Sequence, residues 1–134
     1  MATCARDACD CARPANCIDT VPGRYLATLY VHAPADGEYV APGVVSHALD
    51  VRPSSVTEMF GRLAAAGYVE YAKHDGARLR PDGRRIARTL VHRQRTVERF
   101  FERTTGTSID PAVAFDLGHA MSATTLSRLA GATG

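Results

Sequence analysis

The chain of 134 residues contains no tryptophan, and aromatic residues make up only 7% of it. A hydrophobic core must therefore rest mainly on Leu, Val and Ala. No apolar run approaches the roughly 20 residues that cross a bilayer, and the first residues lack the basic and apolar regions of a secretory signal. These absences predict a cytoplasmic protein that makes no membrane contact.

Arrangements typical of catalytic sites are also absent from the sequence. The histidines are scattered, and they are His32, His47, His74, His92 and His119. No Ser/His/Asp set, carboxylate pair or Gly-rich phosphate loop accompanies them. A lone His on a helix is more often a core or surface residue than a catalyst, so we do not expect an enzyme.

Cysteine is missing from everything after residue 17, because all four cysteines lie before it, at Cys4, Cys9, Cys11 and Cys17. In a reducing cytoplasm, clustered thiols indicate metal ligands or redox groups more often than structural disulfides. Thiolates suit zinc, Cu(I) or an iron–sulfur centre. The spacing does not match a paired C-x2-C knuckle, so a flexible tail over residues 1–20 with exposed thiols remains the alternative.

Acidic residues are scarce in one stretch of a chain whose net charge is only +2. Nine arginines lie between Arg78 and Arg103, where the acidic residues are Asp82, Glu98 and Glu102. Such a basic field suits a polyanion such as nucleic acid. A solvated, arginine-rich helix face would explain the same composition.

Two short helical patterns with a tight turn between them occupy residues 42–66. The first begins at Pro42, a residue that is well tolerated at a helix start. Residues 50–53 form the turn, and Pro53 opens the second helix. That helix has apolar residues three and four positions apart, at Val56, Met59, Phe60 and Leu63. This periodicity predicts a helix with one face in the core.

An alternating hairpin follows, with strands predicted over 68–73 and 77–80 and a turn at 74–76. A helix is expected before these elements, from Gly23, and a long one after them, from residue 81 to about 104. Asp110 and Ser122 precede two further helices. The order predicts a mainly α fold with a small two-stranded β wing. A winged helix-turn-helix would span 21–80 and a helical dimerisation region 81–134, so the partner protein is a second copy of the chain.

The start of the second helix of the helix-turn-helix carries small and polar residues that let a backbone approach the major groove. Candidate DNA contacts on this helix are Arg52, Ser54, Ser55, Thr57, Glu58 and Arg62. Lys73 and Arg78, with His74, suit backbone contacts from the wing. A winged helix that serves only protein contacts is the alternative.

The motif VRPSSVTEMFGRLAAAGYVEY, followed by LRPDGRRIARTLVHRQRTVERFF and HAMS, resembles the DtxR/MntR family of metal-dependent transcriptional repressors. The resemblance covers roughly residues 21–130. It implies an N-terminal winged helix, a helical region for dimerisation and metal binding, and Mn, Fe or Zn as the metal. It also supports the DNA-contact positions from Arg52 to Glu58.

The metal ligands that the resemblance implies are mostly missing. Glu98 and His119 match ligand positions, whereas the other positions hold Arg24, Ala27, Gln94, Phe115 and Gly118. Two ligands are fewer than the three or more that such sites usually have.

The sequence predicts a dimeric, sequence-specific DNA-binding transcriptional regulator, a repressor by resemblance, that binds double-stranded DNA. Either the family metal site at Glu98 and His119 has decayed and a metal or redox signal is sensed at the tail cysteines, or the protein binds DNA without sensing a metal. The alternative is a thiol-rich metal-handling or redox protein that uses its winged helix only for protein contacts.

Overall fold

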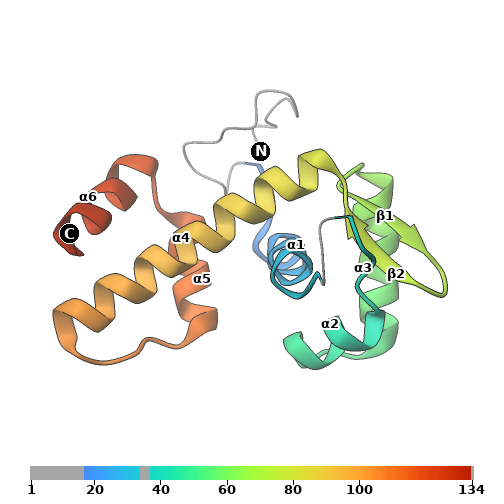
Figure 1. Ribbon diagram of the computed structural model, residues 1–134, viewed down its shortest axis with the longest axis horizontal. Helices are drawn as coiled ribbons and strands as arrows, with labels where there is room; N and C mark the ends of the chain where they lie inside the picture. Colours follow the sequence, from blue (N-terminus) through green and yellow to red (C-terminus); the bar gives the residue numbers. More distant parts are fainter. Residues whose placement is uncertain (1–16, 34–36, 134) are drawn as a thin grey trace. The chain divides into compact units, whose positions relative to one another are not determined.

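A computed structural model describes residues 17–33 and 37–133, and it is mainly α-helical with one two-stranded antiparallel sheet (Figure 1). The elements in chain order are α1 (Thr20–His32), α2 (Pro42–Leu49), α3 (Pro53–Ala65), β1 (Val69–Ala72), β2 (Gly76–Leu79), α4 (Pro81–Thr105), α5 (Pro111–Ala120) and α6 (Ala123–Thr133). This order confirms the predicted fold class. Within these ranges, no helix is both long and apolar enough to cross a membrane.

The described residues form two compact units. The winged unit comprises residues 21–88, and the helical unit joins residues 17–20 to residues 89–133. The long helix α4 contributes to both. The division between these two compact units falls within α4, and the domain boundary at residue 80 stays a prediction.

Helix α1 begins at Thr20, three residues before the predicted start at Gly23. Pro22 lies in its first turn, where the backbone N–H that proline lacks would have no intrahelical partner. Ile18, within the predicted tail, is only 6% exposed. Residues 1–16, which include Cys4, Cys9 and Cys11, lie outside the described residues.

The turn between α2 and α3 is held by Ser46 and Val51. The hydroxyl of Ser46 donates to the carbonyl of Val51 at 2.6 Å, and the N–H of Val51 donates to the carbonyl of Ser46 at 3.1 Å. Asp50 ends α2 in the left-handed conformation, with φ 52°, which Asp tolerates better than most residues. Pro53 then opens α3, as predicted.

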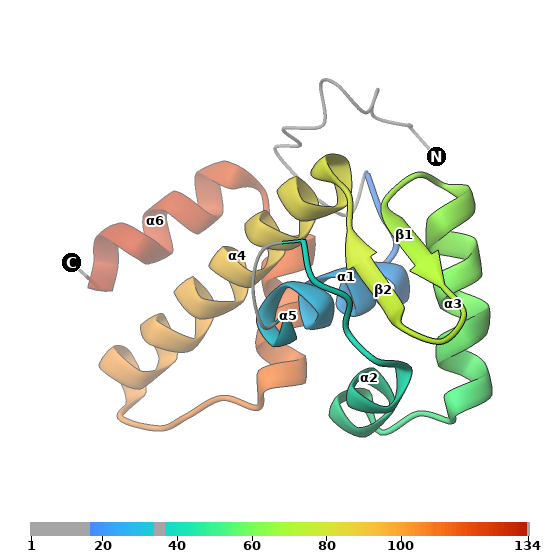
Figure 2. The ribbon, with the colours of Figure 1, turned by 45° about the vertical axis from the view of Figure 1, so that its right-hand side comes forward.

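The predicted core face of α3 is confirmed, because its apolar residues are at most 8% exposed; they are Val56, Met59, Phe60 and Leu63. Phe60 also meets Tyr71 of β1, with ring centroids 5.8 Å apart. Figure 2 shows α3 running beside β1. Burial of this face fixes which side of α3 remains exposed.

The wing pairs β1 with β2, from Val69 opposite Leu79 to Ala72 opposite Gly76. Val40, just before α2, adds an isolated bridge to Ala77 through two backbone hydrogen bonds, of 2.7 and 3.1 Å. Gly76 makes this close approach possible: its φ is 107°, and a Cβ there would collide with the carbonyl of Val40. The wing is thus joined to the segment that leads into α2.

In the helical unit, the two helices predicted after Asp110 and Ser122 are present, and both side chains cap them. Asp110 accepts a hydrogen bond from the N–H of Ala112 at 2.8 Å at the start of α5. Ser122 accepts one from the N–H of Thr125 at 3.2 Å at the start of α6. Side-chain acceptors of this kind satisfy N–H groups that have no partner within the helix.

Candidate DNA-binding surface and the inherited metal positions

The first turn of α3 is exposed and polar. Arg52 is the N-cap residue in an extended conformation, and Arg52, Ser54 and Ser55 are all exposed. The N-terminus of α3 is therefore surrounded by two small side chains, Ser54 and Ser55, and one cation, Arg52. Such an end, with its partly positive N–H groups, favours a phosphate oxygen.

Farther along α3, Glu58 and Arg62 are exposed, and Thr57 is half-buried. The hydroxyl of Thr57 donates to the carbonyl of Ser54 at 3.1 Å. Its oxygen can still accept a hydrogen bond from a ligand, because a hydroxyl both donates and accepts. The predicted DNA-contact residues on α3 therefore lie on its exposed side or at its margin.

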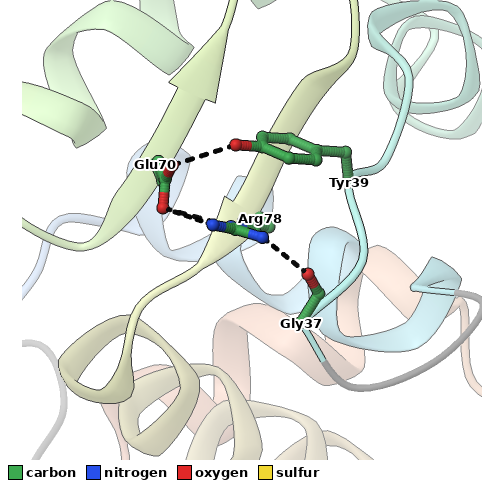
Figure 3. Close-up of polar contacts among 4 residues, drawn as sticks. All are labelled: Gly37, Tyr39, Glu70 and Arg78. Carbon is green, nitrogen blue, oxygen red and sulfur yellow. Dashed lines mark hydrogen bonds and ion pairs between the residues drawn. The ribbon is translucent and has the colours of Figure 1, made fainter.

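The wing residue Arg78 is held by contacts within the chain (Figure 3). Its Nε and Nη2 donate to one carboxylate oxygen of Glu70, at 3.1 and 2.8 Å, and Nη1 donates to the carbonyl of Gly37 at 3.3 Å. The guanidinium also lies over the ring of Tyr39, 4.7 Å from its centroid. Tyr39 donates its hydroxyl to the other oxygen of Glu70 at 3.0 Å. Arg78 thus ties the wing to the segment before α2.

These contacts shift the pKa values of all three side chains. Hydrogen bonds from Arg78 and Tyr39 lower the pKa of Glu70, since both favour the carboxylate. The hydrogen bond to Glu70 raises the pKa of Arg78. Desolvation, followed by the hydrogen bond to Glu70, raises the pKa of Tyr39.

The arginine-rich stretch is used partly inside the protein. Arg78 pairs with Glu70, Arg85 lies 3.4 Å from the carboxylate of Asp82, and Arg84 lies over the ring of Tyr30. Arg93 is buried, with 3% of its surface exposed. The stretch is therefore not one continuous basic face. At the wing tip, Lys73 and His74 are exposed.

Glu98, one of the two matched metal positions, lies in an open groove. Its neighbours there are Arg95, Arg99 and Glu102 of α4 and, after the helix, Ser108, Ile109 and Pro111. This lining mixes cations with carboxylates. No histidine or cysteine belongs to it.

His119, the other matched position, is buried with 5% of its surface exposed. Its ring stacks on Phe115 at 6.1 Å, and its Nε2 lies 2.6 Å from the carbonyl oxygen of Ile18. Because a carbonyl only accepts, Nε2 must carry the proton in this hydrogen bond. Nε2 then has no lone pair for a metal, and of the two ring nitrogens only Nδ1 keeps one.

Gly118 and Arg93 occupy the space between α5 and α4. A Cβ added at Gly118 would meet the carbonyl carbon and the Cβ of Arg93, both at 3.0 Å. The Nη1 of Arg93 donates to the carbonyls of Gly118 at 3.1 Å and Met121 at 2.6 Å. Burial lowers the pKa of this guanidinium, which nevertheless stays charged at neutral pH.

Glu98 in the open groove and buried His119 are the two residues that match ligand positions of the resemblance, and two ligands in different surroundings do not fit a divalent cation. Among residues 17–33 and 37–133, no three His, Cys, Asp or Glu side chains come together in a way that could hold a metal. Of the tail cysteines only Cys17 is described, and it is disulfide-bonded, a state in which its sulfur is not a thiolate. The predicted sites at Cys4, Cys9 and Cys11 lie outside the described residues.

Sequence reasoning missed Ser46, Tyr39, Glu70 and Arg93. One of these had a partial signal, because opposite charges favour cross-strand pairs. The turn lies at residues 73–75 and sets Glu70 opposite Arg78, whereas the predicted turn at 74–76 would set Glu70 opposite Arg80. Ser46 and Arg93 had none. Their partners are backbone carbonyls, which every residue carries.

Comparison with known proteins agrees with this architecture. Residues 21–77 match the family described as iron dependent repressor, N-terminal DNA binding domain. The chain is 37% identical over 76 residues to the HTH-type transcriptional regulator MntR of Geobacillus kaustophilus, covering 57% of this chain and 53% of the relative. For MntR of Oceanobacillus iheyensis the identity is 36% over 78 residues, covering 58% and 52%. The chain thus spans about half the length of these relatives.

Solved structures share the fold. The metal-dependent transcriptional regulator MtsR aligns with a TM-score of 0.69 at 22% identity, covering 83% of this chain and 52% of MtsR. The manganese regulator SloR aligns with a TM-score of 0.67 at 24% identity, covering 81% and 51%. A structure of ScaR with bound Zn2+ aligns with a TM-score of 0.61 at 24% identity, covering 83% and 52%. Residues 21–77 are therefore similar to an iron dependent repressor type of DNA-binding domain, and the chain shares the fold of these solved regulators.

Proposed function

We propose that this protein is a dimeric, sequence-specific DNA-binding transcriptional regulator that acts as a repressor in the cytoplasm. The observation that carries the proposal is the exposed polar start of α3, in a winged unit whose sequence matches a repressor DNA-binding domain. Transcriptional regulators are not an enzyme class, and we assign no catalytic step to any residue.

In this proposal α3 enters the major groove of double-stranded DNA. Ser54 and Ser55 are small enough to let the backbone approach, and their hydroxyls can bond to phosphates or base edges. Arg52 and Arg62 reach phosphate or guanine. Glu58 accepts a hydrogen bond from the amino group of cytosine or orients an arginine side chain.

The wing contributes contacts to the DNA backbone. Lys73 is exposed near its tip and supplies a mobile positive charge. Arg78 is already paired with Glu70. We therefore assign Arg78 mainly to positioning the wing, although part of its side chain remains exposed and can still face a phosphate.

A second copy of the chain supplies the other half of the binding unit. The helical unit leaves Val113 48% exposed and several larger apolar side chains half-buried; these are Phe100, Phe101, Leu117, Met121, Leu126 and Leu129. Burying them between two copies would place one α3 on each half-site of a palindrome. Light scattering of the purified protein should then give twice the mass of one chain.

Fluorescence anisotropy on a duplex selected from a random library tests the proposal. Arg52→Ala and Arg62→Ala should each weaken binding, and each should reduce the slope of log K against log salt by about one if the residue neutralises a phosphate. Arg128→Ala, which removes an exposed arginine from α6, is the control for loss of charge.

The proposal fails if no duplex is enriched, or if both α3 variants bind as tightly as the Arg128→Ala control. Failure to select a duplex would also revive the alternative, in which the winged helix makes only protein contacts.

A further inference from the structure

The contact between α4 and α5 leaves no room for a ligand side chain at residue 118. An added Cβ would lie 3.0 Å from two carbon atoms of Arg93, one of them in the backbone of α4. Carbon atoms in favourable contact are about 3.5–4.0 Å apart. Glycine therefore lets the two helices meet directly, in the space that a metal ligand would need.

The guanidinium of Arg93 already places a positive charge at the carboxyl end of α5. Carbonyls at a helix end lack intrahelical partners and carry partial negative charge. Arg93 donates to two of them, those of Gly118 and Met121. A divalent cation placed nearby would be repelled by this buried guanidinium.

The two residues that match family ligands face different surroundings. Glu98 follows Arg93 by five residues, a rotation of about 140° on a helix with 3.6 residues per turn. Its carboxylate belongs to the groove with Arg95 and Arg99. His119 is buried, and its Nε2 is bound to the carbonyl of Ile18.

We propose that Arg93, Gly118 and His119 replace a bound metal ion in the helical unit. Arg93 supplies the positive charge at the end of α5, Gly118 closes the helix contact, and His119 secures the segment before α1. No divalent cation binds between α4 and α5. If the protein binds DNA as proposed above, its binding to a duplex does not depend on a metal at this site.

Manganese is a suitable probe because it prefers carboxylate and other oxygen ligands, whereas thiolates select softer metals. Wild-type protein would be melted in EDTA and in MnCl2, with unfolding followed by circular dichroism. Both melting temperatures should agree within about 1 °C. A site filled at about 100 times its Kd would instead raise the melting temperature by several degrees, which would overturn the proposal.

Duplex binding in EDTA and in MnCl2 supplies the second measurement. Affinities within about twofold of each other support metal independence, and loss of binding in EDTA contradicts it. Absence of binding under both conditions would contradict the proposed function instead. The melting comparison would then still decide whether manganese binds.

Variants of Arg93 test the need for a cation at this position. Arg93→Met keeps an unbranched side chain without charge, and Arg93→Lys keeps the charge. The Met variant should melt several degrees below wild type, and the Lys variant should recover part of that loss. Arg95→Met, at an exposed position on the same helix, is the control. Equal melting temperatures for the Lys and Met variants would refute the electrostatic role.

Discussion

Replacing Gly118 by alanine should push α5 away from α4. The new Cβ would lie 3.0 Å from both the carbonyl carbon and the Cβ of Arg93, about half an ångström inside the favourable separation of carbon atoms. Overpacking of this kind costs about 1–3 kcal/mol. The carbonyls of Gly118 and Met121 would also move relative to the guanidinium that they bind.

Gly131→Ala is a matched control. Gly131 lies two residues before the end of α6, as Gly118 does before the end of α5, and a Cβ at Gly131 would meet nothing within 4 Å. Both variants gain the helix propensity of alanine, up to about 1 kcal/mol in a helix interior. The difference between them therefore isolates the cost of the helix contact.

Thermal and urea unfolding of the two variants would measure this difference. We expect Gly118→Ala to be less stable than Gly131→Ala by about 1–3 kcal/mol. In a chain of this size, that corresponds to a melting temperature lower by about 4–12 °C. If Gly118→Ala were as stable as Gly131→Ala, α4 and α5 would not be in direct contact at this position.

Two further predictions concern the winged unit. The lowered pKa of Glu70 means that its contribution to stability is present above the unfolded pKa, near 4.5, and is lost as pH falls through the folded pKa. The stability of wild type relative to Glu70→Gln, measured by urea unfolding, should therefore shrink below about pH 4.5; a constant difference would show that the ion pair with Arg78 contributes nothing. Ser46→Ala removes the hydrogen bond to the Val51 carbonyl and should cost about 0.5–1.5 kcal/mol. The exposed Ser55→Ala should stay within about 0.5 kcal/mol of wild type, and equal values for the two serine variants would refute the role of Ser46.

Much of the winged unit was predictable because its signals are local. Pro53 opens α3, the apolar spacing from Val56 to Leu63 fixes its buried face, and the predicted wing turn at 74–76 lies within one residue of the observed turn at 73–75. Each depends on residues close together in the chain. The predicted start of α1 at Gly23 is too late because it treats Pro22 as the close of the tail, whereas proline is compatible with a first helical turn.

The metal positions depend on contacts between residues far apart in the chain, which local sequence patterns do not predict. By itself, the sequence determined the order of the helices, the exposed polar start of α3, and the loss of most family ligands. Only the tertiary structure decided what replaced them. The contacts of Arg93 with Gly118 and Met121, and of His119 with Ile18, join residues 25, 28 and 101 positions apart. Backbone carbonyls accept these hydrogen bonds, and since every residue has one, no sequence pattern marks which carbonyl folding will bring to a buried side chain.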